Sequence, residues 1–451
     1  MSGGETKNRS FNGRRFPKSI SPLVIGLAVF CVSLISFLQA AHHNGILWAP
    51  PKNGGDEDSY ERLGYNLAAG LGFGYCPCDL PVLLGEEEPP ATEKCVPHCN
   101  PELFEPTAYR PPGFPFLVAA VNLIQPLNFG LIRIINCICC AAGIAIVAFV
   151  LARQYSIAAA LVMGLTCSVD PRLREFAGTF LTENLATMAC SSFAVSLAMF
   201  LERKDRLSAA FCGASLTTLV FIRSFYVAWY PVIWICVAIV MFRSRARGGE
   251  NVRSWMLTLS VFCLTSLALT LPWWIRNCVV LDGVMPTGTQ GGIGIADGFS
   301  DSAWAAHGSW TSQTANQIAD ELRRDPDTRN LQGIAFEKEQ CVRGSAAATS
   351  WIQHNPDKLI TLAWWKLSRL WQAGSLWHPL LFGAAAIGLF VSRRQELAKV
   401  TMLLLLLNSV TVMATYHTYE RFLTPLRPVI HAFAAIGVLV AFATCRRLAA
   451  R

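Results

Sequence analysis

Long apolar stretches separated by short basic turns dominate the chain. They run over 22–41, 129–151, 156–170, 185–201, 207–222, 225–242, 254–272, 376–392, 399–416 and 423–443. Most approach the roughly 20 residues that an α-helix needs to cross a bilayer. Because lipid cannot satisfy backbone polar groups, helix is the expected state of each stretch. The pattern predicts an all-α polytopic membrane protein with about ten transmembrane helices.

Two long polar segments interrupt the apolar pattern, and both are expected to contain amphipathic helices. Within the second, residues 314–347 favour helix and Asp325-Pro326-Asp327 predicts a break. The glycines between 288 and 298 predict a loop. The expected division is a cytoplasmic tail over 1–21, an N-terminal transmembrane module over 22–272 with a first outer loop over 42–128, a second outer segment over 273–375, and C-terminal transmembrane helices over 376–451.

Charge supports this organisation. Only 15% of the residues are charged, against about 25% in soluble domains, and the net charge is +8. Basic residues collect in the N-terminal tail, in alternate loops and at the C-terminus, which places both termini in the cytoplasm. The expected location is therefore the plasma (inner) membrane, with both polar segments on its outer side. Basic patches with interleaved aromatic residues, as nucleic-acid binders carry, are absent outside these loops.

The first apolar stretch is interpreted as an uncleaved anchor, because its core is long and Gln39-Ala40-Ala41 is a poor cleavage context.

Four of the 16 cysteines, Cys76, Cys78, Cys95 and Cys99, cluster in the first outer loop. Two disulfides on an oxidising face are one interpretation. A zinc site that includes His98 and free thiols are the alternatives, and the spacing is not that of a standard zinc finger.

Candidate chemistry begins directly after the first apolar stretch. The acidic run Asp56-Glu57-Asp58 opens a helix-like segment that ends at Gly70-Leu71-Gly72-Phe73. Carboxylates just outside a membrane helix indicate an active site at the membrane surface. Four further elements follow in order: Arg110-Pro111-Pro112-Gly113-Phe114-Pro115, Thr182-Glu183, Pro272-Trp273-Trp274-Ile275-Arg276-Asn277 and Tyr419-Glu420-Arg421-Phe422-Leu423-Thr424-Pro425.

This ordered set resembles the motifs of the integral-membrane (GT-C) glycosyltransferases, the clan that includes protein mannosyltransferases and the aminoarabinose transferase acting on lipid A. The resemblance runs across nearly the whole chain. It implies a GT-C fold and an inverting transfer of a sugar, hexose or pentose, from a polyprenyl-phosphate donor to a hydroxyl of a lipid or glycan acceptor. A role in making cell-envelope glycans such as lipopolysaccharide would follow.

The resemblance also implies roles for individual residues. Asp56 is the expected base, with Glu183 in support, and Arg110 and Arg421 are the expected phosphate ligands. The expected substrate-binding residues are Glu57, Tyr60 and Arg62. Relatives often carry a basic residue three positions after the aspartate, where this chain has Ser59. The chemistry is sound independently, because a carboxylate can deprotonate a hydroxyl and guanidinium groups match phosphate.

Structural interpretations of the same residues remain open. The acidic run fits a solvated helix N-terminus, and Glu183 fits a helix cap. Arg110 could extend to lipid head groups, and Arg421 could pair with Glu420 or anchor the interface. No cofactor or metal site is assigned, although a divalent ion near Glu105 and His98 is a candidate. A polytopic transporter or lipid flippase is the alternative function, opposed by the absence of repeated halves.

Overall fold

The computed structural model describes residues 21–52, 54–75, 104–248, 252–372, 375–416 and 419–450, with the backbone alone for 244–248, 419 and 420. Residues 1–20 of the tail predicted over 1–21 lie outside these residues, and so do the cysteine cluster Cys76, Cys78, Cys95 and Cys99 and His98. Apart from one short antiparallel pair, β1 (Gly74–Tyr75) with β2 (Glu105–Pro106), the described elements are helices. The predicted all-α class is confirmed.

Each of the ten apolar stretches forms a helix. These are α1 (Pro22–His43), α5 (Phe129–Gln154), α6 (Ile157–Ser168), α8 (Glu183–Arg203), α9 (Arg206–Ile222), α10 (Trp229–Gly248), α11 (Val252–Val280), α17 (Trp377–Ser392), α18 (Glu396–Ala414) and α19 (Arg427–Ala449). In the described part of the chain, seven helical segments are long and apolar enough to cross a membrane, whereas α6, α9 and α17 are shorter. The protein is therefore a multi-pass membrane protein, and some of its spans are short.

Two features differ from the apolar pattern. Residues 113–124, inside the expected first outer loop, form the apolar helix α4 (Gly113–Ile124). It packs against α2 (Asp56–Ala68), where Gly64 faces Val118 with no room for a Cβ atom. The helix expected to end at residue 272 instead continues through Pro272 as far as Val280. Proline removes one backbone donor but does not by itself end a long membrane helix.

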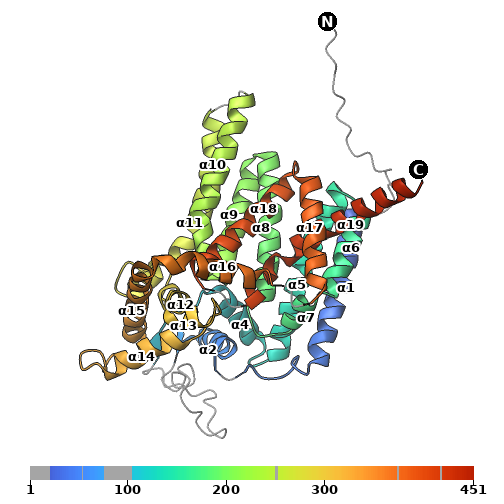
Figure 1. The fold of residues 1–451 in the computed structure, drawn as a ribbon. Coiled ribbons are helices and arrows are strands. Elements are labelled where there is room, and N and C mark those ends of the chain that lie inside the picture. Colours follow the sequence, from blue (N-terminus) through green and yellow to red (C-terminus); the bar gives the residue numbers. More distant parts are fainter. Residues whose placement is uncertain are drawn as a thin grey trace.

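The second polar segment folds into a group of helices, most of which lie in the lower left of Figure 1. They are α12 (Gln290–Gly298), α13 (Asp301–Ala305), α14 (Gln313–Arg324), α15 (Gly333–His354), η4 (Pro356–Lys358) and α16 (Leu359–Leu370). The break at Asp325-Pro326-Asp327 is confirmed between α14 and α15. The expected glycine loop is wrong, because Gly292 and Gly298 lie in α12 and allow its close approach to α15 and to Thr415.

Small residues bring α17 and α19 into backbone contact. A Cβ atom on Gly388 would overlap the carbonyl oxygen of Phe433, and one on Gly437 would overlap that of Ala384. Membrane helices lack a hydrophobic driving force between them, so such close approach is a main source of attraction. This contact positions α19, whose first turn follows the segment that carries Arg421.

We expect Gly388→Val to destabilise the protein by about 1–3 kcal/mol, because the new side chain forces α17 away from α19. The measurement is thermal unfolding of the purified protein in detergent. Gly383→Val is the matched control, since Gly383 lies in the same helix and has open space where a Cβ atom would be added. Equal melting temperatures for the two variants would contradict the packing argument.

Candidate active site

Five charged side chains from five segments form one chain of alternating ion pairs. Arg110 Nη2 lies 2.7 Å from Asp56 Oδ1, and Arg421 Nη2 lies 3.0 Å from Asp56 Oδ2. Arg421 Nε lies 2.5 Å from Glu183 Oε1, and Arg223 Nη2 lies 2.9 Å from the same oxygen. The order is therefore Arg110, Asp56, Arg421, Glu183, Arg223. We call this set the charge chain.

Asp56 occupies the first turn of α2. The two residues before it, Gly54 and Gly55, have φ values of 70° and 81°, which residues other than glycine rarely adopt. This turn leads out of the loop after α1 and begins the helix at Asp56. A carboxylate at this position is stabilised by the helix dipole. The Asp56 side chain is 31% exposed, whereas the Arg110 side chain is 8% exposed. In this ion pair the carboxylate is therefore the more accessible group.

Arg110 is held from three sides. Its Nε donates to Ser59 Oγ at 3.2 Å, and that hydroxyl is also 2.5 Å from the Tyr75 hydroxyl. Its guanidinium carbon lies 5.2 Å from the ring centre of Tyr60 and 4.7 Å from that of Tyr109. Aromatic faces attract cations without hydrogen-bonding to them. The packing therefore fixes the guanidinium and leaves its donors for oxygen ligands.

The strand before Arg110 is anchored by the second polar segment. Glu337 of α15 accepts hydrogen bonds from the Thr107 hydroxyl at 2.5 Å and the Ala108 backbone N–H at 3.1 Å, and also from the Thr289 hydroxyl. Arg276 of α11 donates to the carbonyl oxygens of Thr107 and Phe73. Burial raises the pKa of Glu337, and the three donors oppose that rise. These contacts determine where Arg110 lies.

Glu183 and Arg223 form the buried end of the charge chain. Glu183 is the first residue of α8 and is fully buried, and Arg223 directly follows α9. The carboxylate therefore takes two guanidinium groups rather than only capping its helix. A buried carboxylate needs this pairing, because an unpaired charge in a low-dielectric surrounding is strongly unfavourable.

Arg421 lies in η5 (Tyr419–Phe422), whose position is set by its neighbours. Arg223 Nη1 donates to the Arg421 carbonyl oxygen at 3.3 Å, and the Phe422 ring stacks on Phe225 at 4.4 Å. The preceding loop is held by Lys366 of α16, which is 1% exposed and donates to the Thr415 carbonyl oxygen at 2.6 Å. Burial lowers the pKa of Lys366 to about 7.

The electrostatic balance of the charge chain favours an anion. It contains three guanidinium groups and two carboxylates, so it carries one excess positive charge when all are ionised. Burial alone would raise the pKa of Asp56, but Arg110 and Arg421 outweigh burial and hold that pKa well below its usual value. Asp56 is therefore an ion-paired carboxylate in this state and a weak base.

The structure brings together four of the seven predicted site residues: Asp56, Glu183, Arg110 and Arg421. Tyr60 is buried against Arg110. The other two lie apart from the charge chain. Glu57 accepts from the backbone N–H groups of Lys52 and Phe180 at 3.0 and 3.3 Å, and Arg62 pairs with Asp58 at 2.9 Å. Their substrate-binding roles stay predictions.

Three contributors were missed from the sequence: Arg223, Ser59 and Glu337. Arg223 had a visible signal, because it stands between two apolar stretches at the end where basic residues are otherwise scarce. Ser59 appeared only as a departure from the family pattern, yet it accepts from Arg110. Glu337 had no signal, since its partners lie 48 to 230 residues away in sequence.

A narrow cleft adjoins Arg110. Its walls are largely apolar and come from α9, η3 (Ser224–Ala228), α11 and the loop before α12, and the lining residues are Arg110, Pro111, Pro112, Val220, Phe221, Ser224, Val227, Trp273, Trp274, Pro286 and Thr287. Only 22% of the 18-residue apolar stretch of α11 is buried within the protein, so this helix lies at the edge of the bundle. The cleft thus joins a guanidinium group to an apolar surface.

The donor set of the charge chain does not suit a metal ion. Across the described ranges, no three His, Cys, Asp or Glu side chains gather as metal ligands. The two carboxylates are instead surrounded by three guanidinium groups. Glu105, the other predicted candidate, lies in β2, and its partner His98 falls outside the described residues.

No protein-family model matches the chain, and no curated protein matches it by sequence. Its structure is similar to the apo oligosaccharyltransferase of Archaeoglobus fulgidus, with a TM-score of 0.51 and 13% identity over 94% of this chain and 51% of that one. Archaeoglobus fulgidus AglB in complex with an inhibitory peptide and a dolichol-phosphate gives 0.49 at 13% identity over the same shares. ArnT from Cupriavidus metallidurans bound to undecaprenyl phosphate gives 0.39 at 14% identity, over 92% of this chain and 77% of that one.

The likeness to the apo oligosaccharyltransferase confirms the predicted GT-C fold. The chain spans about half the length of that archaeal protein. At 13% identity the likeness concerns the fold, and the function has to be argued from the site.

We expect Glu183→Gln to lower the stability of the protein by about 2–4 kcal/mol, because the fully buried carboxylate is the shared partner of two guanidinium groups that are 12% and 26% exposed. Thermal unfolding in detergent measures the loss. Glu175→Gln is the control: that side chain is 53% exposed and pairs with Arg172 at the surface, so its loss should stay within about 1 kcal/mol. A Glu183→Gln variant as stable as this control would contradict the burial argument.

Lys366 predicts a pH-dependent stability. Its folded pKa of about 7 lies below the unfolded value of about 10.4, so between these limits the unfolded chain binds one more proton. The free energy of unfolding should therefore rise as the pH increases from about 7 to 10. Melting temperatures across this range should show a slope in the wild type that Lys366→Met reduces. Lys399→Met, at a side chain that is 49% exposed, should keep the slope; parallel curves for all three proteins would refute the assignment.

Proposed function

We propose that this protein is an inverting glycosyltransferase that moves a sugar from a polyprenyl-phosphate donor to a hydroxyl of a lipid or glycan acceptor. The observation that carries the proposal is the placement of Asp56 between Arg110 and Arg421, which come from distant segments. This arrangement presents a base and two phosphate ligands in one place. The GT-C fold is consistent with the same chemistry.

The donor phosphate would bind by exchanging partners. Arg110 and Arg421 each donate to Asp56 in the structure, and a phosphate offers stronger oxygen acceptors for the same planar groups. The excess positive charge of the charge chain favours this anion. The space beside Arg110 is only about 20 Å³, so the first part of the prenyl chain would lie against the apolar side chains that border it and not inside it.

Partner exchange would also activate the base. Once the phosphate draws the guanidinium groups, Asp56 loses part of the attraction that keeps its pKa low, and its basicity increases. The acceptor hydroxyl oxygen would then attack the anomeric carbon while Asp56 takes the hydroxyl proton. The bond between that carbon and the phosphate oxygen breaks, and its electron pair leaves with the polyprenyl phosphate, stabilised by Arg110 and Arg421.

Glu183 and Arg223 would support the reaction from the buried side. They keep one face of Arg421 occupied, so its Nη2 remains directed at Asp56. Tyr60 would position Arg110 through its ring. The guanidinium groups of the charge chain would supply the positive charge at the point where the phosphate leaves.

The bias of basic residues supports placing the site on the outer side of the plasma membrane, where lipid-linked sugars would meet their acceptors. In this proposal the first outer loop supplies Asp56 and Arg110, and the second outer segment fixes them through Glu337. The sugar would be a hexose or a pentose, and the product an envelope glycan or glycolipid.

The test uses the full-length protein in nanodiscs with a panel of polyprenyl-phosphate sugars, and it measures donor consumption and sugar transfer. Asp56→Asn should reduce transfer at least about 100-fold, the lower range of a general base. Donor binding should persist or tighten, because the competing carboxylate charge is gone. Arg110→Gln should instead weaken donor binding about tenfold or more, through loss of a charged hydrogen bond.

The control is Asp320→Asn, at a side chain that is 53% exposed on α14, which should leave transfer unchanged. Full transfer by Asp56→Asn would remove this residue from the mechanism. In proteoliposomes, movement of the lipid-linked sugar across the membrane without its consumption would favour the transporter or flippase alternative.

A further inference from the structure

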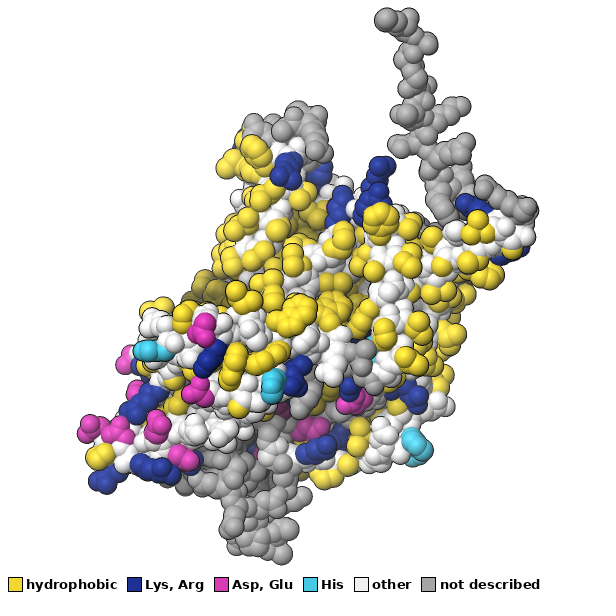
Figure 2. Space-filling model, in the orientation of Figure 1, with side chains coloured by type: hydrophobic (Ala, Val, Ile, Leu, Met, Phe, Trp, Pro, Cys, Tyr) yellow, Lys and Arg dark blue, Asp and Glu magenta, His cyan; other side chains and the backbone are white. Residues whose placement is uncertain are grey.

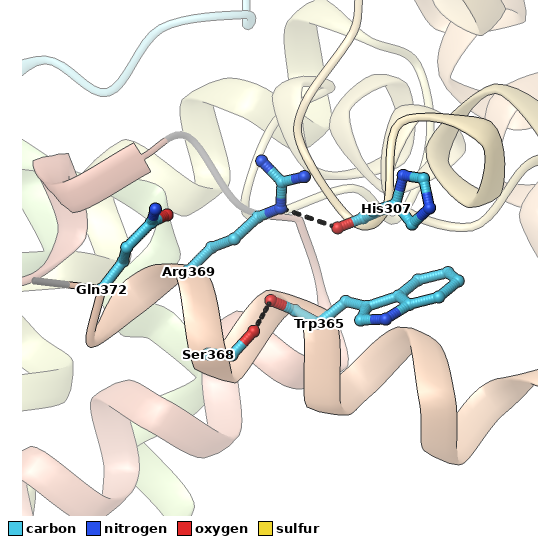
Figure 3. Close-up of a pocket in the computed structure, with 5 residues that line it drawn as sticks. All are labelled: His307, Trp365, Ser368, Arg369 and Gln372. Atoms are coloured by element: carbon cyan, nitrogen blue, oxygen red, sulfur yellow. Dashed lines mark hydrogen bonds between the residues drawn. The ribbon is translucent and has the colours of Figure 1, made fainter. Parts of the chain in front are cut away.

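A second polar site lies on α16, away from the charge chain. An open surface pocket of about 480 Å³, called the cavity below, is lined by His307, Trp365, Ser368, Arg369 and Gln372. In Figure 3 the side chains of Trp365 and Arg369 extend from α16, Gln372 lies just beyond the end of this helix, and His307 comes from the loop after α13. The volume falls in the range of small-molecule sites, about 300–1,000 Å³.

The residues of α16 divide into three faces. Leu362, Lys366 and Leu370 are buried against the protein. Ile360 and Trp364, on a second face, are 83% and 64% exposed despite being large and apolar. The cavity residues form the third face. A helix with one buried, one exposed apolar and one polar face is typical of the membrane–water interface, where Figure 2 shows the apolar surface giving way to charged side chains.

The backbone at His307 is unusual. His307 has a φ of 50° and occupies the position after α13 where glycine is usual. The N–H groups of His307 and Gly308 donate to the carbonyl oxygens of Trp304 and Ala303 at 3.0 and 2.8 Å, which fixes this turn. The His307 ring packs 4.7 Å from Trp365, over the cavity.

Arg369 is oriented by the same turn. Its Nε donates to the His307 carbonyl oxygen at 2.8 Å, which directs the two terminal nitrogens away from α16 (Figure 3). The residues that line the cavity include neither Asp nor Glu. The Trp365 indole is partly exposed and packs 4.6 Å from Trp304, and the Ser368 hydroxyl donates to the Trp365 carbonyl oxygen at 2.9 Å. The site therefore combines a partly covered aromatic platform, a guanidinium group, a hydroxyl that can still accept a hydrogen bond and an amide.

We propose that this cavity binds a sugar that carries a phosphate or carboxylate group. The apolar face of a sugar ring would stack on Trp365, its hydroxyls would bond to Ser368 and Gln372, and its acidic group would meet Arg369. An uncharged sugar would use only the first two contacts. A phosphate alone would leave the indole unused, so the combination selects an acidic sugar.

The position of the cavity assigns it to the acceptor, an assignment that rests on the proposed function. The buried face of α16 carries Lys366, which holds the loop leading to η5, and α16 packs directly against η5. One helix thus separates the cavity from Arg421. The acidic sugar bound there would be part of the acceptor, either attached to a lipid in the same bilayer or free in solution.

The test measures binding to the full-length protein in nanodiscs by saturation-transfer NMR and titration calorimetry. The soluble probes are glucuronic acid, glucose 1-phosphate and glucose, and the lipid probe is glucuronosyl diacylglycerol placed in the nanodisc. The charged sugars should bind at least about tenfold more tightly than glucose. Arg369→Gln should remove that preference, and Trp365→Leu should weaken binding of all the sugars.

The matched control is Arg324→Gln, at an exposed arginine at the end of α14, which should bind as the wild type does. Binding of the lipid probe alone would identify a lipid-anchored acceptor, and binding of the soluble probes would identify a free glycan. Equal binding of charged and neutral sugars, or binding unaffected by both variants, would overturn the proposal.

The same measurements separate this proposal from the function on which it rests. Donor consumption without sugar binding that depends on Arg369 would overturn the acidic-sugar site alone. Arg369-dependent binding in a protein that consumes no polyprenyl-phosphate sugar would overturn the proposed function and leave the binding site in place.

Discussion

The pairing of Asp56 and Glu183 with Arg110, Arg223 and Arg421 is the constraint on which the rest of the structure depends. Charges near a membrane bundle are unfavourable unless each finds an opposite partner. Here every carboxylate has two guanidinium partners, so the five segments that carry them are drawn to one place. The opposite charges offset the cost of burying one another, and three guanidinium groups against two carboxylates leave one excess positive charge.

Close approaches between helices at glycine residues add to the large hydrophobic core in keeping this arrangement in position. Glycine lets α2 approach α4, α12 approach α15, and α17 approach α19. Glu337 and Arg276 then fix the short strand before Arg110 from opposite sides. Stiff support of this kind keeps donors directed at a position before a ligand arrives, which is how a site stabilises charge that develops during a reaction.

The two proposed sites divide recognition between them. The charge chain offers guanidinium groups beside an apolar cleft, which matches a phosphate with a prenyl chain. The cavity on α16 offers an aromatic platform with one guanidinium, which matches an acidic sugar. The two proposed sites are structurally linked, because α16 packs on η5 and Lys366 holds the loop before it.

The sequence by itself determined the all-α fold, ten of the apolar helices, the break near Pro326 and four members of the charge chain. Apolar run length and short ordered motifs are local properties, and local properties can be recognised in one chain. The tertiary structure alone decided that α4 is an apolar helix packed on α2, that the glycines near 290 lie in a helix, and that Glu57 and Arg62 point elsewhere. The tertiary structure also decided the contributions of Arg223, Ser59, Glu337 and the cavity at Trp365. Each of these depends on contacts between residues far apart along the chain, and a single sequence contains no readable pattern for such contacts.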